Sequence, residues 1–240
     1  MDFSCNTKWE VDMQLIFIHG SGGSGESFYY QTKYFTDSIA IDLPGHPEGS
    51  PCSTIDAYTN WLHDYIKAHD FSDVILAGHS LGGGICLNYA LTFPGELKAL
   101  ILIGSGLKLR VHPMFLDAFK NAIDTPELFE EMIDPVYTLV PPQLAHTLKQ
   151  RSIEIGPRVM LNDMQACDAF NIIGREKEIT LPTLAICGAD DLMTPPKYSR
   201  FMADTLPNAQ AAIIDGGTHF VFAEKPDDVN QMIEDFIKKF

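Results

Sequence analysis

Residues 78–82 read Gly-His-Ser-Leu-Gly and form a GxSxG pattern centred on Ser80. An apolar run at 73–77 precedes the pattern, and residues 80–92 are expected to form a helix that a Pro-Gly pair ends. A serine on a sharp strand-to-helix turn projects its hydroxyl above the sheet, where the free N–H groups of the helix can stabilise an anion. The stretch therefore predicts Ser80 as a nucleophile and the N–H of Leu81 as an oxyanion donor.

The glycines on either side of Ser80 have a steric explanation. Side chains two residues before and two residues after the serine would collide with a turn this sharp, which predicts the glycines at 78 and 82. Three consecutive glycines at 82–84 weaken a helix, so we expect that helix to pack closely against the sheet.

Apolar runs alternate with amphipathic segments along most of the chain. The runs predict strands at residues 13–19, 38–43, 73–77, 97–103, 181–187 and 209–215. This alternation is typical of an α/β fold with a mostly parallel sheet that is covered by helices on both faces. Residues 107–178 break the alternation and are rich in helix starts. They predict a helical lid inserted after the fourth strand, with the core formed by 1–106 and 179–240.

Candidate acid and base residues follow the last two predicted strands. Asp190 and Asp191 follow the fifth strand, and His219 follows the sixth after two glycines. The order Ser, Asp, His fits a triad in which an imidazole takes the serine proton and a carboxylate orients the imidazole. His219 is favoured because it alone of the eight histidines follows a C-terminal strand, after glycines that let its loop reach back over the sheet. The two aspartates remain alternatives at this point.

The loop at residues 19–25, His-Gly-Ser-Gly-Gly-Ser-Gly, has two interpretations. Its glycines let backbone N–H groups approach a ligand, so the N–H of Ser21, or else that of Gly22, is the expected second oxyanion donor. The loop also contains GxGxxG, and Asp42 follows about 20 residues later, as in dinucleotide-binding oxidoreductases. The later Ser, Asp and His favour the hydrolytic interpretation. A receptor that keeps a hydrolase-like shape is a third alternative.

Composition excludes several classes of function. The net charge is −15, from 32 acidic and 17 basic residues, which disfavours a nucleic-acid partner. The N-terminus lacks a signal-like segment, and no apolar run is long enough to span a membrane. Five cysteines without a CxxC pair predict a reducing, cytoplasmic location. No metal-binding motif is present, so we expect no metal and no cofactor.

Taken together, these motifs resemble the α/β-hydrolase superfamily, and within it the small esterase-like branch. The resemblance runs from about Met13 to the C-terminal helix and rests on five motifs: HGSGG at 19–23, DLPGH at 42–46, GHSLGG at 78–83, GADD at 188–191, and GTH at 217–219 followed by EKP. In that family the catalytic acid is the fourth residue of the GxxD motif, which implies Asp191. The family also has strands before its first parallel strand. Only about 12 residues precede Met13, so we expect one short N-terminal strand or none.

The resemblance is a weaker guide to the substrate. It favours a carboxylesterase that cleaves small or medium esters through an acyl-enzyme on Ser80. The alternatives are a C–C bond hydrolase acting on dienoic acids and a lactonase. The expected partner is a small-molecule ester. The residues expected to line the substrate pocket are Gly22, His79, Met114, Phe115, Phe119 and Phe220.

Overall fold

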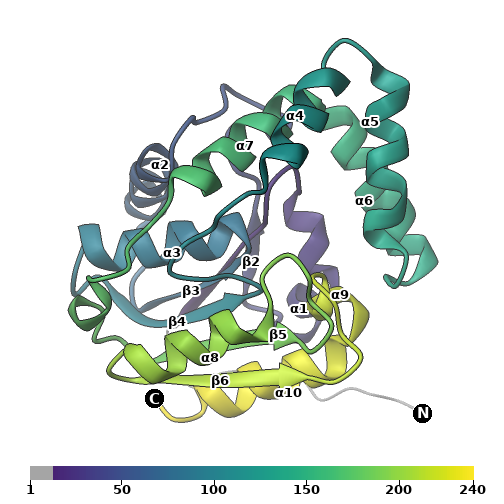
Figure 1. Cartoon of the computed structure of the whole chain (residues 1–240). Helices are drawn as coiled ribbons and strands as arrows, with labels where there is room; N and C mark the ends of the chain where they lie inside the picture. Colours follow the sequence, from purple (N-terminus) through teal and green to yellow (C-terminus); the bar gives the residue numbers. More distant parts are fainter. Residues whose placement is uncertain (1–12) are drawn as a thin grey trace.

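The computed structural model describes residues 13–240, and their strands form one parallel sheet (Figure 1). The strand order is β2-β1-β3-β4-β5-β6, and every neighbouring pair is parallel. The strands are β1 (Gln14–Ile18), β2 (Ile39–Ile41), β3 (Val74–His79), β4 (Leu97–Ile103), β5 (Thr183–Gly188) and β6 (Ala209–Ile214). All six predicted strands are therefore present. The expectation about a further N-terminal strand concerns residues outside the described part.

Helices cover both faces of the sheet, as the alternation predicted. Successive side chains of a strand point to opposite faces, so Phe17 and Ile75 contribute to one core cluster while Ile16 and Leu76 contribute to the other. The first cluster is covered by η1 (Gly25–Phe28), α1 (Tyr29–Tyr34), α9 (Val221–Glu224) and α10 (Pro226–Ile237). The second is covered by α2 (Ile55–Ala68), α3 (Leu81–Thr92) and α8 (Pro196–Thr205). Each fully buried large side chain stabilises the fold by about 1.5–3 kcal/mol.

The glycines of α3 allow that helix to approach the sheet closely. A Cβ atom at Gly82 would overlap the carbonyl oxygen of Ile18 at the end of β1, and one at Gly83 would overlap the side chain of Ser105. The helix is buried continuously from its first residue through Ala90. Close packing thus explains why helix-weakening residues occupy this helix.

The segment 107–178, called the insertion below, lies between β4 and β5. It contains α4 (Pro113–Ala122), α5 (Pro126–Ile133), η2 (Asp134–Tyr137), α6 (Pro142–Ile155), α7 (Pro157–Ala169) and η3 (Glu176–Glu178). Its four α-helices each begin with a proline. Proline suits the first turn of a helix because the backbone N–H that it lacks would have no partner there. In Figure 1, α4, α5 and α6 stand together beside the core, and α7 leads back over it.

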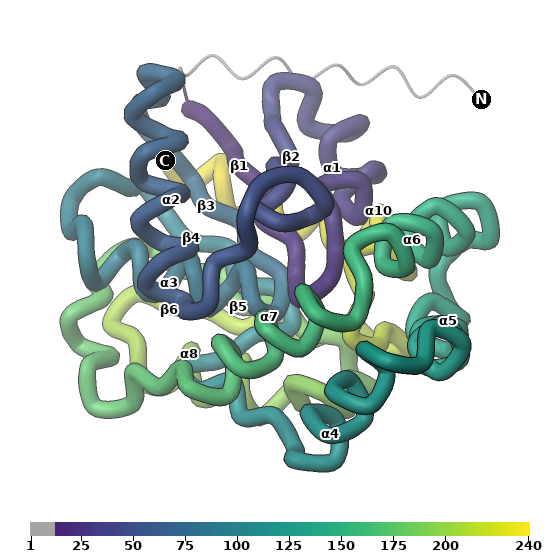
Figure 2. Tube along the Cα trace, turned by 90° about the horizontal axis from the view of Figure 1, so that it is seen from above, coloured from purple at the N-terminus to yellow at the C-terminus, as the bar shows by residue number. Residues whose placement is uncertain are grey.

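The two ends of the insertion pair with each other. Ile172 donates its N–H to the carbonyl of Leu107 at 2.9 Å, and Lys108 and Asn171 form an antiparallel bridge. This neck lets β4 and β5 remain neighbours in the sheet although about 80 residues separate them. Figure 2 shows the same arrangement from above, with α4–α6 on one side of the molecule.

No helix within residues 13–240 is both long enough and apolar enough to cross a membrane. The cytoplasmic location that the cysteine content indicates stays a prediction.

Candidate active site

Ser80 occupies the sharp turn that the GxSxG pattern predicted. It lies between the end of β3 and the start of α3, with φ +52° and ψ −113°, a region that non-glycine residues rarely adopt. Its N–H donates to the carbonyl of Ile103 at 3.0 Å, and its own carbonyl accepts from Oγ of Ser105 at 2.9 Å. A Cβ at Gly78 would overlap the backbone of Gly82. The predicted steric reason for that glycine is therefore confirmed, whereas Gly82 is required by contact with β1.

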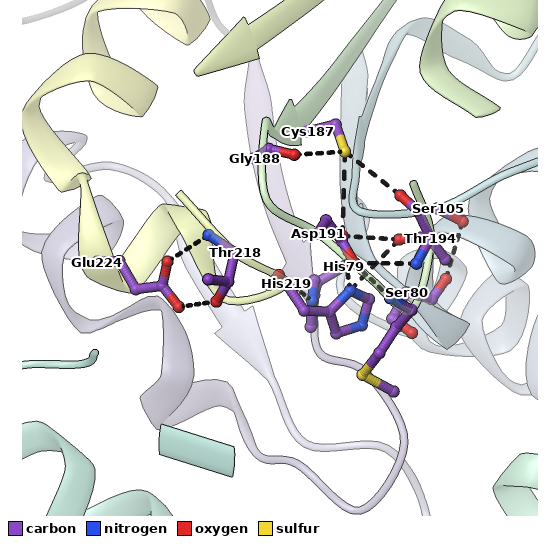
Figure 3. Close-up of polar contacts among 11 residues, drawn as sticks. His79, Ser80, Ser105, Cys187, Gly188, Asp191, Thr194, Thr218, His219 and Glu224 are labelled. Atoms are coloured by element: carbon purple, nitrogen blue, oxygen red, sulfur yellow. Dashed lines mark hydrogen bonds and ion pairs between the residues drawn. The ribbon is translucent and has the colours of Figure 1, made fainter. Parts of the chain in front are cut away.

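Asp191, not Asp190, lies beside His219 (Figure 3). Its Oδ2 accepts a hydrogen bond from Nδ1 of His219 at 2.8 Å, whereas Asp190 is exposed. Oδ1 of Asp191 accepts from the backbone N–H groups of Met193 and Thr194 at 2.8 and 2.9 Å. The hydroxyl of Thr194 adds a bond to Oδ2 at 2.9 Å. The carboxylate thus also closes the turn that precedes Pro195.

The surroundings of Asp191 favour its ionised form. Burial acts to raise the pKa of this carboxyl, but the hydrogen bond from His219 and the bonds from Thr194 outweigh burial and hold the pKa below its usual value. Because Nδ1 of His219 donates to this carboxylate, Nε2 of the neutral ring carries the lone pair. The pair has the arrangement that a general base requires.

Short contacts join the loop that carries His219, called the histidine loop below, to the turn at Ser80. A Cβ at Gly104 would lie 3.2 Å from Nδ1 of His219 and 3.3 Å from Oδ2 of Asp191. Gly104 directly follows Ile103, the residue that accepts the N–H of Ser80. Thr218, the residue before His219, donates both its N–H and its hydroxyl to the carboxylate of Glu224. The three catalytic candidates therefore follow β3, β5 and β6 at the carboxyl edge of the sheet, where parallel sheets bind ligands.

His79 lies beneath the histidine loop. It is buried, and its Nε2 donates to the carbonyl of His219 at 3.0 Å. Burial, together with the charge of the nearby His219 when protonated, holds the pKa of His79 well below its usual value. A neutral, buried ring with its Nε2–H already bound supports the loop from below. The side chain of His79 is only 2% exposed, and the contact with substrate that was expected of it stays a prediction.

The glycine-rich loop at residues 19–25 lies against the nucleophile. A Cβ at Gly20 would lie 3.1 Å from Cβ of Ser80 and 2.8 Å from Nδ1 of His79. Within residues 13–240, the N–H groups of Ser21 and Leu81 donate to no other protein group. The N–H of Gly22 instead donates to Oδ2 of Asp163 at 2.9 Å. Of the two alternatives for the second oxyanion donor, Gly22 is therefore already engaged and Ser21 is not.

The dinucleotide interpretation of this loop is wrong. Oδ1 of Asp42 accepts the N–H of Gly25 at 2.7 Å, so the expected ribose-binding carboxylate is bound to the loop itself. A Cβ at Gly25 would also meet the carbonyl oxygen of Ala40 at 2.8 Å. The loop thus packs against β2, and the Asp42 carboxylate is bound within the protein.

The other expected pocket residues are distributed over four environments. Phe220 is half-buried, and its ring lies 5.7 Å from that of His219 and 4.8 Å from that of Tyr137 in the insertion. Phe119 packs inside the insertion, 6.3 Å from the ring of Phe129. Met114 and Phe115 are exposed at the start of α4. Gly22 lies under the side chain of Met160. The structure thus brings Phe220 to the site, and the pocket role of the others stays a prediction.

A buried polar cluster that was not predicted from the sequence joins the insertion to the core. Asp163 of α7 accepts from Nε2 of His46 at 2.8 Å and from the hydroxyl of Tyr58 at 2.7 Å, in addition to the N–H of Gly22. All three side chains are fully or almost fully buried. One signal was available, because Asp163 lies on the same face of α7 as the apolar residues Met160 and Cys167. A carboxylate on the buried face of a helix indicates a polar partner inside the protein.

Thiol chemistry finds no support near the site. Burial, followed by the charge of Asp191, raises the pKa of Cys187 to about 12. Burial also raises the pKa of Cys86 above its ordinary range. Both thiols therefore stay protonated and unreactive at neutral pH. Among residues 13–240, no group of three or more His, Cys, Asp or Glu side chains is arranged to hold a metal ion.

Residues 15–232 match the model of the alpha/beta hydrolase family. The chain is similar to a lipase-esterase related protein from Clostridium acetobutylicum ATCC 824, with a TM-score of 0.80, 25% identity and 95% of each chain covered. It is also similar to a thermophilic esterase, with a TM-score of 0.80 and 27% identity over 94% of this chain and 89% of the other.

One curated relative is longer than this chain. The dihydrolipoyllysine-residue acetyltransferase component of the acetoin cleaving system of Pseudomonas putida is 27% identical over 246 residues. That alignment covers 94% of this chain and 63% of the relative. The chain spans 56–63% of the length of the first curated relatives that it matches.

Proposed function

Because the chain belongs to the alpha/beta hydrolase family, we propose that it is a serine hydrolase and that it cleaves small or medium carboxylic esters. The observation that carries the proposal is the buried pair of His219 and Asp191, joined over 2.8 Å beside the strained turn of Ser80. The esterases among its structural neighbours support the same substrate class.

In the proposed mechanism, His219 removes the proton of the Ser80 hydroxyl through Nε2 while Oγ attacks the ester carbonyl. The negative charge that develops on the carbonyl oxygen is stabilised by the N–H groups of Ser21 and Leu81. When the tetrahedral intermediate collapses, the alcohol leaves with the proton from His219 and the acyl group stays on Ser80. His219 then deprotonates a water molecule whose oxygen attacks the acyl carbonyl. The bond to Oγ of Ser80 breaks, Oγ takes the proton from His219, and the carboxylic acid leaves. Asp191 stabilises the imidazolium in both halves.

The insertion is proposed to serve as the lid of this site, with residues 1–106 and 179–240 as the hydrolase core. The contact between Tyr137 of the insertion and Phe220 beside His219 supports this role. The aromatic rings of Tyr137 and Phe220 beside His219 favour an apolar acyl or alkyl group. The proposed partner is a small-molecule ester, and the mechanism needs no cofactor.

The proposal is tested by the hydrolysis of p-nitrophenyl acetate, butyrate and octanoate by the wild type and by Ser80→Ala. We expect turnover to fall in the variant by at least about 10³-fold, as when other triads lose their nucleophile. A fluorophosphonate should label Ser80 in the wild type, which identifies the nucleophile independently of the substrate. Activity that survives in a folded Ser80→Ala would refute the assignment. A labelled protein that ignores all three esters would redirect the search to lactones and dienoic acids, the alternative substrates of the family.

A further inference from the structure

Gly22 follows the proposed oxyanion donor Ser21, and the insertion holds both of its backbone polar groups. Its N–H donates to Oδ2 of Asp163 on α7 at 2.9 Å, and its carbonyl accepts from Oγ of Ser152 on α6 at 3.2 Å. Met160 covers its Cα, where an added Cβ would overlap the thioether. The insertion thus fixes the peptide planes on both sides of Gly22.

These contacts extend to the N–H of Ser21 through rigid peptide planes. The carbonyl of Gly22 shares a plane with the N–H of Gly23, which donates to the carbonyl of Gly20 at 3.1 Å. The carbonyl of Gly20 in turn shares a plane with the N–H of Ser21 and points in the opposite direction. His19 donates its Nδ1 hydrogen to that same carbonyl at 2.8 Å. The direction of the Ser21 N–H therefore depends on where the insertion holds Gly22.

The anchor at Asp163 is built as a charged, fully satisfied cluster. Its carboxylate is fully buried and accepts three hydrogen bonds, from Gly22, His46 and Tyr58. Burial acts to lower the pKa of His46, but its hydrogen bond and ion pair with Asp163 raise that pKa above the usual value. Buried carboxylates are retained only where their charge is paired in this way. A charge-assisted bond also orients the Gly22 N–H more firmly than a neutral acceptor would.

We propose that the insertion is a working part of the oxyanion hole, in which Asp163 is a positioning residue that aims the N–H of Ser21 through Gly22. Ser152, which accepts the hydroxyl hydrogen of Tyr137 at 3.0 Å, acts from the other side of the same glycine. The inference rests on the proposed serine hydrolase function and adds a component that lies 141 residues from the loop it orients.

The test compares Asp163→Ala with Asp163→Asn, because asparagine can still accept the N–H of Gly22 and alanine cannot. We expect Asp163→Ala to lower kcat for p-nitrophenyl butyrate about 10- to 100-fold with KM changed by less than about threefold, since an oxyanion donor acts mainly in the transition state. Asp163→Asn should recover most of that loss. Ser152→Ala should give the same signature with about a fivefold loss, together with a modest fall in stability because the buried Tyr137 hydroxyl and Gly22 carbonyl lose a partner.

An aryl trifluoromethyl ketone provides a readout that a merely structural residue would not affect. Oγ of Ser80 adds to its carbonyl, His219 takes the proton, and the hemiketal oxygen becomes an anion in the oxyanion hole. The inhibition constant should therefore rise in each variant by the factor by which kcat/KM falls. Glu26→Gln is the matched control, because it removes a 2.8 Å ion pair between the core and Arg151 of the insertion without touching Gly22. It should leave kcat and the inhibition constant unchanged.

The outcomes separate this inference from the function on which it rests. If the wild type is not labelled at Ser80 by a fluorophosphonate, the proposed function fails. If the wild type is labelled and Asp163→Ala is folded with unchanged kcat and inhibition constant, the inference fails. Equal losses in Glu26→Gln and Asp163→Ala would also overturn it, because they would indicate general loosening of the insertion. Should Asp163→Ala not fold, Ser152→Ala decides, and unchanged kinetics in that variant would refute the proposal.

Discussion

Thr194 donates its hydroxyl hydrogen to Oδ2 of Asp191 over 2.9 Å, and that oxygen also accepts Nδ1 of His219. The same hydroxyl lies 3.3 Å from Nδ1 of His219, so it touches both members of the pair. Thr194 therefore helps to hold Oδ2 of Asp191 in the position where this oxygen accepts the hydrogen bond from His219.

The first prediction follows from this contact. Replacing Thr194 by valine removes one hydrogen bond to a charged acceptor while keeping the shape of the side chain. A loss of about 1 kcal/mol in orientation of the base corresponds to roughly a fivefold fall in kcat. Thr194→Ser keeps the hydroxyl and should stay close to the wild type. If the valine and serine variants hydrolyse p-nitrophenyl esters at equal rates, the hydroxyl has no role in orienting the pair.

The two neighbouring aspartates provide a matched pair for the second prediction. Asp191→Asn should lower kcat by about 10³- to 10⁴-fold, because an amide cannot stabilise the imidazolium and permits the wrong tautomer. Asp190→Asn should change kcat by less than about twofold, since Asp190 is exposed and its carboxylate does not contact His219. Steady-state kinetics of both variants check this prediction, and a large loss in Asp190→Asn would contradict the assignment.

The third prediction concerns stability at mildly acidic pH. Burial, with the charge of His46, lowers the pKa of His19 to about 3, and burial holds the pKa of His79 well below 6.5. Below pH 6.5 the unfolded chain therefore binds up to two protons that the folded chain excludes. Stability should fall as the pH drops from about 6.5 to 5, with a limiting slope of about 2.7 kcal/mol per pH unit from these two groups.

The raised pKa of His46 acts in the opposite direction above pH 6.5. Its contribution to stability is fully present below that pH and is lost as the pH rises through its folded pKa. The free energy of unfolding should therefore be greatest near pH 6.5. Urea unfolding at half-unit steps from pH 5 to 8 measures the profile, and a flat acidic limb would show that His19 and His79 are protonated in the folded protein.

The fourth prediction concerns the cysteines. Cys86, Cys167 and Cys187 are buried, and burial, together with other causes, raises the pKa of Cys167 and Cys187 to about 12. Cys52 is only partly buried, although burial and the charge of Asp163 raise its pKa as well. In a Cys5→Ser background, a thiol reagent at pH 8 should modify Cys52 first and the other three only after unfolding. Rapid labelling of Cys187 in the folded protein would show that the loop after β5, which carries Asp191, opens.

The sequence predicted the parts of this structure that depend on local pattern. The strand at residues 97–103 and the turn at Ser80 were predictable because short apolar runs and paired glycines have few other structural solutions. The choice between Asp190 and Asp191 was not local. It required the resemblance to a known motif, and the structure supports it through the turn that Met193 and Thr194 close on Asp191.

The remaining parts of the site depend on contacts between distant segments. Asp163 meets Gly22 and His46 only because the insertion folds back over the core, and no spacing rule connects these positions. The inward orientation of His79 also depends on distant contacts, since the histidine donates to the carbonyl of His219 while its neighbour Ser80 is half-buried at the turn. Periodicity gives the face of a helix or strand but not the partner that covers it.

Leu107 and Ile172 form the neck at which both ends of the insertion join the core. A single junction of this kind suggests that the insertion could be exchanged for another cap. The contacts of Asp163 and Ser152 with Gly22 limit such an exchange. A chimaera that receives a foreign cap at this junction would change its substrate range and, in the same step, lose the acceptor and donor that hold its own glycine loop. Grafting or directed evolution of new specificity in this scaffold should therefore carry Ser152 and Asp163 along with any transplanted helices.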